Sequence, residues 1–129
     1  MIGYNEIMDT IQKAKKILEN LENVQFAYLF GSYANKKQTE KSDVDIALYL
    51  KDYNFDAKLS IHHALQRALQ KEIDLVVLNR TRNYDLLSDI LDEGILLKDS
   101  EDDAREMFEL QKEHEIKDYI VFKKMNDVA

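Results

Sequence analysis

The sequence contains no cysteine, no proline and no tryptophan, and only three of its 129 residues are glycine. Without cysteine the chain forms no disulfide and offers no thiolate to a metal, so a metal site would have to use oxygen or nitrogen ligands. The absence of cysteine suits a cytoplasmic protein. Because there is neither an internal repeat nor a proline- or glycine-rich linker, we expect a single domain over residues 1–129.

The chain also lacks long apolar runs and an excess of positive charge. No stretch approaches the roughly 18 consecutive apolar residues of a membrane-spanning helix, and the first residues lack the basic start of a secretory signal. The formal net charge is −7, which argues against stable nucleic-acid binding, because neutralising phosphates requires a basic surface. We therefore expect a globular domain that contacts neither membranes nor nucleic acids.

The spacing of the apolar residues predicts alternating helices and strands and hence an α/β (α+β) fold class. Apolar residues recur at helical spacing in three segments: 5–22, 55–70 and 83–92. Asn5 is the expected N-cap of the first helix, and Phe55, Leu59, Ile61, Leu65 and Leu69 are the expected buried positions of the second. Strands are predicted at four places: 24–30, 43–50, 72–78 and 95–97.

A last helix is predicted over residues 100–125. Its acidic start, residues 101–103, would lie in the first turn, where the helix dipole favours negative charge. The successive apolar residues 119–122 point around a helix rather than along one side. This helix therefore either docks partly on the core or presents a surface to a partner protein.

The stretch from residue 30 to residue 50 contains the candidate chemistry. The first apolar strand stops at Gly31-Ser32, where glycine lets the backbone approach a ligand closely. Ser32 is an expected N-cap of a short helix, whose free N–H groups would favour an anion. Lys36 and Lys41 lie beside this turn in the sequence, and they would either hold a triphosphate or be ordinary solvated lysines. Together these residues predict a phosphate site.

Two carboxylates follow closely. Asp43 and Asp45 lie on the same face of the predicted strand, opposite Val44 and Ile46, because side chains alternate along a strand. Adjacent like charges repel and gain nothing for folding, so a divalent cation is the economical partner for them. Asp74 likewise interrupts an otherwise aliphatic strand, either as a functional group or as an ordinary aspartate at a strand edge.

The pattern of Gly31-Ser32, ten intervening residues and then Asp43-Val44-Asp45 resembles the signature of the DNA polymerase beta-like nucleotidyltransferase superfamily. The chain is most similar to its minimal nucleotidyltransferase (MNT) branch, whose members are typically antitoxin partners of HEPN toxins. The resemblance covers roughly residues 24–98. It implies the nucleotidyltransferase fold, with a small mixed β-sheet of three to four strands flanked by helices.

The resemblance also implies the roles of the site residues. Asp43, Asp45 and Asp74 would be both catalytic residues and ligands of two Mg²⁺ ions, with Asp74 on the side of the attacking hydroxyl. The β and γ phosphates of the substrate ATP would lie against Gly31 and Ser32. The implied function is transfer of AMP to a hydroxyl, expected to be a tyrosine, of a HEPN toxin, with the chain acting as the antitoxin.

Two other functions remain open at this point. One is a nucleotidyltransferase for small molecules, of the aminoglycoside type, that completes its pocket by forming a homodimer. The other is a non-catalytic antitoxin that binds and sequesters its partner. The chain is occupied by the nucleotide-handling core and its flanking helices, which favours an acceptor that brings its own binding surface.

Overall fold

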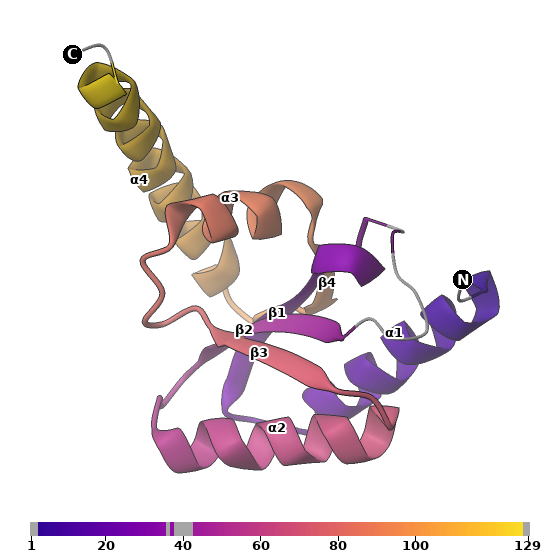
Figure 1. Cartoon of the computed structure of the whole chain (residues 1–129). Helices are drawn as coiled ribbons and strands as arrows, with labels where there is room; N and C mark the ends of the chain where they lie inside the picture. Colours follow the sequence, from indigo (N-terminus) through magenta and orange to yellow (C-terminus); the bar gives the residue numbers. More distant parts are fainter. Residues whose placement is uncertain (1–2, 36, 38–42, 128–129) are drawn as a thin grey trace.

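The computed structural model describes residues 3–35, 37 and 43–127, in which helices and strands alternate (Figure 1). The elements in chain order are α1 (Tyr4–Glu19), β1 (Val24–Phe30), the 3₁₀ turn η1 (Gly31–Tyr33), β2 (Val44–Leu50), α2 (Phe55–Leu69), β3 (Ile73–Val77), α3 (Tyr84–Glu93), β4 (Ile95–Lys98) and α4 (Ala104–Asp127). The predicted alternation is therefore confirmed, with boundaries that shift by a few residues. None of the described helices is both long enough and apolar enough to cross a membrane.

The four strands form one mixed sheet in the order β3-β2-β1-β4. β1 is antiparallel to both β2 and β4, whereas β2 and β3 are parallel. Parallel neighbours need a crossover connection, which α2 provides. The end of β1 and the starts of β2 and β3 consequently meet at the same end of the sheet.

Helices cover both faces of the sheet, as Figure 1 shows. On one face, α1 and α2 pack against the inward side chains of the strands, including Val44, Ile46 and Leu48 of β2. On the other face, α3 and the first half of α4 enclose a second core that contains Phe26 and Ala47. Side chains on both faces of the sheet are therefore buried, and only the ends and edges of the sheet remain open for function.

Asparagine side chains cap the starts of two helices. Asn54 accepts a hydrogen bond from the backbone N–H of Ala57 at 2.7 Å and so caps α2. Asn83 accepts one from Leu86 N–H at 3.1 Å and caps α3, whose predicted end at Gly94 is confirmed. These caps satisfy N–H groups that have no partner inside the helix.

Two predicted caps are wrong. α1 begins directly after Gly3 without a side-chain cap, and Asn5 lies inside the helix. Ser32 lies within η1, where Phe30 occupies the capping position and no side chain caps the turn. In both cases the chain enters the helical conformation earlier than the first good capping residue.

The prediction that all five apolar positions of α2 are buried is wrong for two of them. Ile61, Leu65 and Leu69 are buried, four residues apart along the side that covers the sheet. Phe55 is 69% exposed and Leu59 is 42% exposed. Both lie beside β3, the edge strand of the sheet, and not beneath the sheet.

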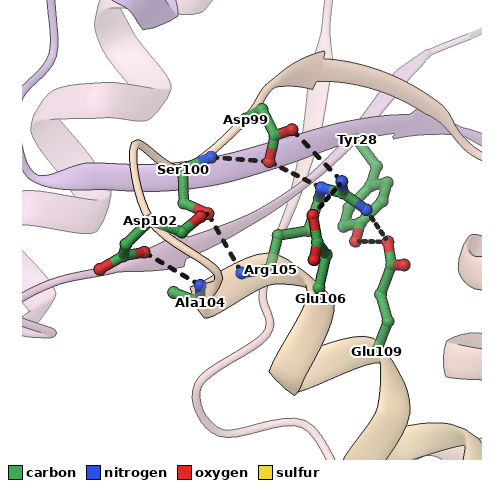
Figure 2. Close-up of polar contacts among 8 residues, drawn as sticks. All are labelled: Tyr28, Asp99, Ser100, Asp102, Ala104, Arg105, Glu106 and Glu109. Atoms are coloured by element: carbon green, nitrogen blue, oxygen red, sulfur yellow. Dashed lines mark hydrogen bonds and ion pairs between the residues drawn. The ribbon is translucent and has the colours of Figure 1, made fainter.

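The first turn of α4 does not contain the acidic residues 101–103, which lie in the preceding loop. Asp102 there accepts a hydrogen bond from Ala104 N–H at 2.9 Å. Figure 2 shows how Arg105 then fixes the helix to the sheet, with its Nε 2.7 Å from Asp99 Oδ1 and its Nη1 3.1 Å from Glu109 Oε1. Tyr28 of β1 donates its hydroxyl hydrogen to the same Glu109 carboxylate at 2.5 Å.

Only part of α4 is covered by the rest of the chain. Phe108 and Ile116 are buried in the second core, but the C-terminal half of the helix extends away from the body (Figure 1). Apolar side chains are exposed along that half: Ile120, Val121, Phe122 and Met125. Of the successive apolar residues 119–122, the last three are therefore exposed, whereas Tyr119 is half-buried against Tyr84 of α3.

Candidate active site

Gly31, directly after β1, has a backbone φ of +71°, which side-chain-bearing residues rarely adopt. A Cβ atom at this position would overlap the carboxylate of Asp45. Phe30, the residue before it, pairs with Asp45 across the antiparallel strands. The glycine therefore brings the end of β1 directly against the acid of β2, a closeness that any other residue would prevent.

Asp74 is the direct partner of Asp45 in the parallel pairing of β3 with β2. Neighbouring strands lie about 4.8 Å apart, so two side chains on the same face in register are adjacent. Asp74 is exposed and Asp45 is half-buried. Asp43 immediately precedes β2, two residues before Asp45 and also exposed. The structure thus brings the three acids to one end of the sheet, next to Gly31.

The charge state of Asp45 reflects this crowding. Burial, repulsion by Asp74, a hydrogen bond with Asp74 and repulsion by Asp43 together raise the pKa of Asp45 to about 6. Burial is the largest cause, because it removes water that would stabilise the ionised carboxylate. An ionised Asp45 therefore costs the fold free energy near neutral pH, which a bound cation would offset.

The fit of these residues to a divalent cation rests on their donor chemistry. Carboxylate oxygens are the hard ligands that Mg²⁺ prefers, and Asp45 and Asp74 supply two of them side by side. Within residues 3–35, 37 and 43–127, no three acidic or histidine side chains are already grouped around a single point. The paired acids suit a cation that is completed by oxygens from a phosphate, which is usual for Mg²⁺.

The other predicted site residues are not all described by the structure. Ser32 is half-buried in η1, directly after Gly31. Lys36 and Lys41, the predicted phosphate contacts, lie outside the described residues. His62, on α2, has its Nε2 2.8 Å from the carbonyl oxygen of Ile73, the residue before Asp74.

One residue beside the site was missed by the sequence analysis. Tyr33, the last residue of η1, is only 1% exposed and packs in the core beneath α1 and α2. Its ring anchors the turn that follows Gly31. The signal in the sequence was an aromatic residue directly after the glycine-serine turn. An aromatic ring at such a position can pack into the core and anchor the turn, which polar loop residues cannot do.

The model of the family described as polymerase beta, nucleotidyltransferase, matches residues 12–103, which include both paired strands and all three acids. The chain belongs to the polymerase beta nucleotidyltransferase family. Members of this family transfer nucleotidyl groups, so the chain is a nucleotidyltransferase. The predicted fold and enzyme class are thereby confirmed.

Within this family, the chain is similar to proteins named as protein adenylyltransferases. A Methanocaldococcus jannaschii protein, MJ1379, named provisionally as a protein adenylyltransferase, is 35% identical over 82 residues, spanning 61% of this chain and 82% of the relative. The protein adenylyltransferase MntA of Shewanella oneidensis is 33% identical over 81 residues, spanning 62% of this chain and 58% of MntA.

Solved structures extend the similarity to nearly the whole chain. A chain of a toxin–antitoxin structure with AMP-PNP superposes with a TM-score of 0.75 at 28% identity, covering 92% of this chain and 97% of that one. A chain from a complex of tri-AMPylated Shewanella oneidensis HEPN toxin with MNT antitoxin gives a TM-score of 0.71 at 25% identity, covering 95% and 98%. The similarity therefore includes α4, which lies beyond the family match.

Proposed function

We propose that this nucleotidyltransferase is the antitoxin of a HEPN toxin and transfers AMP from ATP to a tyrosine hydroxyl of that toxin in the cytoplasm. The observation that supports this most is the pairing of Asp45 with Asp74 beside the Gly31 turn. Antitoxin relatives of the same fold occur with AMP-PNP and with an AMPylated HEPN toxin. A site that combines acids with a close backbone turn suits a triphosphate and its cations.

The reaction would proceed as an in-line displacement. The β and γ phosphates of ATP lie against the backbone at Gly31 and Ser32, which leaves the α-phosphorus open to attack. The acceptor oxygen forms a bond to this phosphorus while the bond to the bridging oxygen of pyrophosphate breaks. Asp74 orients the acceptor hydroxyl and takes its proton. Two Mg²⁺ ions held by Asp43, Asp45 and Asp74 would neutralise the charge that develops on the attacking and leaving oxygens.

The exposed part of α4, within residues 100–125, is the proposed contact surface for the toxin. Ile120, Val121 and Phe122 are 44%, 56% and 66% exposed, an unusual density of apolar side chains for a helix in water. The first half of α4 also borders an open hollow of about 690 Å³ into which the exposed Met107 and Leu110 project. Burying these side chains against a protein would remove them from water.

Transfer can be tested with ATP labelled at the α-phosphate, Mg²⁺ and a purified HEPN protein. We expect label on the HEPN protein and a single modified residue type, tyrosine, by mass spectrometry. Asp45→Asn and Asp74→Asn should each lower the rate at least about 100-fold, because both acids act on the transferring group. Asp89→Asn, an exposed aspartate on α3, is the matched control and should retain the wild-type rate.

The same assay separates the two alternatives. A small-molecule nucleotidyltransferase, working as a homodimer, would label a small alcohol such as an aminoglycoside but no protein. A non-catalytic antitoxin would neutralise the HEPN toxin equally well when Asp43, Asp45 and Asp74 are all replaced by asparagine. If instead the triple variant fails to protect RNA from the toxin although it still binds it, catalysis is the basis of neutralisation.

A further inference from the structure

A groove of about 250 Å³ runs along the outer edge of the sheet, between α2 and β3. Its walls are four side chains of α2 and one short stretch of β3: Phe55, Lys58, Leu59, His62 and residues 73–75. Asp74 belongs to this stretch, so the groove directly adjoins the candidate active site. The proposed roles of the acids, in binding cations and phosphates, do not require an apolar groove at this position.

The apolar side of this groove comes from the two α2 residues that do not enter the core. Phe55 is 69% exposed and Leu59 is 42% exposed. His62 ties the helix to the strand, because its Nε2 lies 2.8 Å from the carbonyl oxygen of Ile73. The hollow is therefore held open between a fixed helix and a fixed strand, and its apolar lining faces water.

β3 itself offers free backbone groups to this groove. Val44 N–H donates to the carbonyl of Glu72, and Leu78 N–H donates to the carbonyl of Leu48. The even-numbered residues of β3 thus point their backbone groups to β2, and the odd-numbered ones point theirs outward. Within the described part of the chain no strand pairs with that outer side.

Two of the outward carbonyls already have partners. The carbonyl of Ile73 lies against His62, and that of Val77 accepts from Arg80 N–H. Leu75, between them, presents its N–H and its C=O to the edge at the level of the groove. A segment added here would therefore make its first backbone hydrogen bonds next to Asp74.

We propose that the acceptor protein binds along this edge as an extended segment, with an apolar side chain in the groove and the adjacent tyrosine beside Asp74. This inference rests on the proposed function and specifies where its protein acceptor binds. Addition of a strand to an open sheet edge is a common way to hold a peptide, with backbone bonds giving affinity and pockets giving specificity. Because Asp74 lines the groove, a segment bound there lies next to the residue that would take the proton of the acceptor hydroxyl. We therefore assign the groove to the acceptor protein.

The geometry of strands fixes the spacing of the two contacts. Ile73 and Leu75 face α2, whereas Asp74 faces the opposite side of the sheet. Neighbouring residues of an added strand also point to opposite sides. The residue in the groove must therefore be the one directly before or directly after the modified tyrosine, which makes the apolar neighbour a determinant of acceptor choice.

A charge in the groove provides the first test. Leu59→Glu should raise the KM for the HEPN protein at least about tenfold, because an apolar anchor can no longer be buried there. The KM for ATP and the kcat at saturating acceptor should stay within about twofold, since Leu59 lies on α2, outside the Gly31 turn and the strands that carry the acids. Ser60→Glu adds the same charge to the exposed next residue of α2 and should leave all three constants unchanged.

A cross-link provides the second test and does not depend on loss of function. Because the chain contains no cysteine, Leu59→Cys introduces a unique thiol that can carry a maleimide-benzophenone. Irradiation with the HEPN protein should attach the label directly beside the tyrosine that receives AMP. Ser60→Cys, labelled in the same way, should give little cross-linking at that position.

The outcomes separate this inference from the function on which it rests. An unchanged acceptor KM for Leu59→Glu in an active enzyme, or a cross-link remote from the modified tyrosine, overturns binding at the β3 edge and leaves AMP transfer intact. A wild-type chain that labels no protein overturns both.

Discussion

The backbone of Gly31 lies directly against the carboxylate of Asp45, with no space for a side chain between the end of β1 and the start of β2. Gly31→Ala should therefore destabilise the fold by about 2–4 kcal/mol, from the left-handed φ of +71° together with the displaced acid. Nucleotidyl transfer should be lost as well. Urea unfolding measures the first effect and labelled ATP the second.

Gly3→Ala is the control for this substitution. A Cβ at Gly3 meets no atom within 4 Å, and its φ of −72° is open to any residue. Its stability and rate should match the wild type. Equal effects of the two substitutions would show that the close approach of Gly31 to Asp45 is unimportant.

Asp45→Asn should stabilise the protein near neutral pH when no divalent cation is present. The pKa of Asp45 is about 6 in the fold and about 3.9 in an unfolded chain. The folded state therefore loses stability as the pH rises between these values, where the unfolded chain ionises more easily. Allowing for partial exposure, asparagine should add about 1 kcal/mol at pH 7.5 and almost nothing at pH 4. Denaturation in EDTA at both values measures this.

The exposed Asp89→Asn on α3 supplies the comparison for this experiment. It removes the same charge without relieving the paired acids, so it should not reproduce the difference between the two pH values. A stabilisation by Asp45→Asn that is the same at pH 4 and pH 7.5 would contradict the repulsion described for the site.

Arg105→Gln should loosen the start of α4. The Arg105 side chain is 19% exposed and its guanidinium pairs with both Asp99 and Glu109, so its removal should lower stability by about 1–2 kcal/mol. Arg105 holds the pKa of Asp99 below its usual range, chiefly through a hydrogen bond. The stabilisation that Asp99 gains is therefore present at neutral pH and is lost as the pH falls through its folded pKa.

Thermal unfolding and hydrogen exchange of the α4 amides measure this loosening. Lys117→Gln, an exposed position farther along the same helix, should change neither. The difference between Arg105→Gln and wild type should shrink as the pH falls below about 3.9, the pKa of an unfolded aspartate, and should be smallest below the lowered folded pKa of Asp99, where Asp99 is neutral in both states. A pH-independent loss would mean that packing of the arginine, not its charge, fixes the helix.

Phe122→Asp should weaken the complex with the HEPN toxin without changing the fold. Phe122 is 66% exposed, so the isolated protein should unfold at the same temperature. If this half of α4 contacts the toxin, the Kd should rise at least about tenfold, measured by calorimetry. Lys117→Asp is the charge control, and a complex that tolerates Phe122→Asp would place the contact surface elsewhere.

The sequence was most informative where residues alternate on a strand. The burial of Val44 and Ile46 and the opposite direction of Asp45 follow from a period of two, which tertiary structure leaves unchanged. That Asp74 is the partner of Asp45 depends on the order and direction of the strands. Periodicity within one strand carries no such information, and only the resemblance to the family implied it.

The errors have a different physical origin. Phe55 and Leu59 have the spacing of core residues, but the sheet beneath α2 ends at β3, so they extend past it. The width of a sheet is a property of the assembled fold, not of one helix. Asn5 is a good capping residue by type, yet α1 is capped two residues earlier, at Gly3, at no evident cost, since an exposed helix end can be satisfied by water.

The length of α4 has a consequence for how the chain can be held. A helix of 24 residues measures about 36 Å from end to end, and it rests on α3 as far as Tyr119, which packs against Tyr84. Its C-terminal end therefore extends away from the body of the molecule (Figure 1). If this end holds the toxin as proposed, the toxin can stay bound there while its acceptor segment reaches Asp74, so binding and transfer would use different parts of the chain.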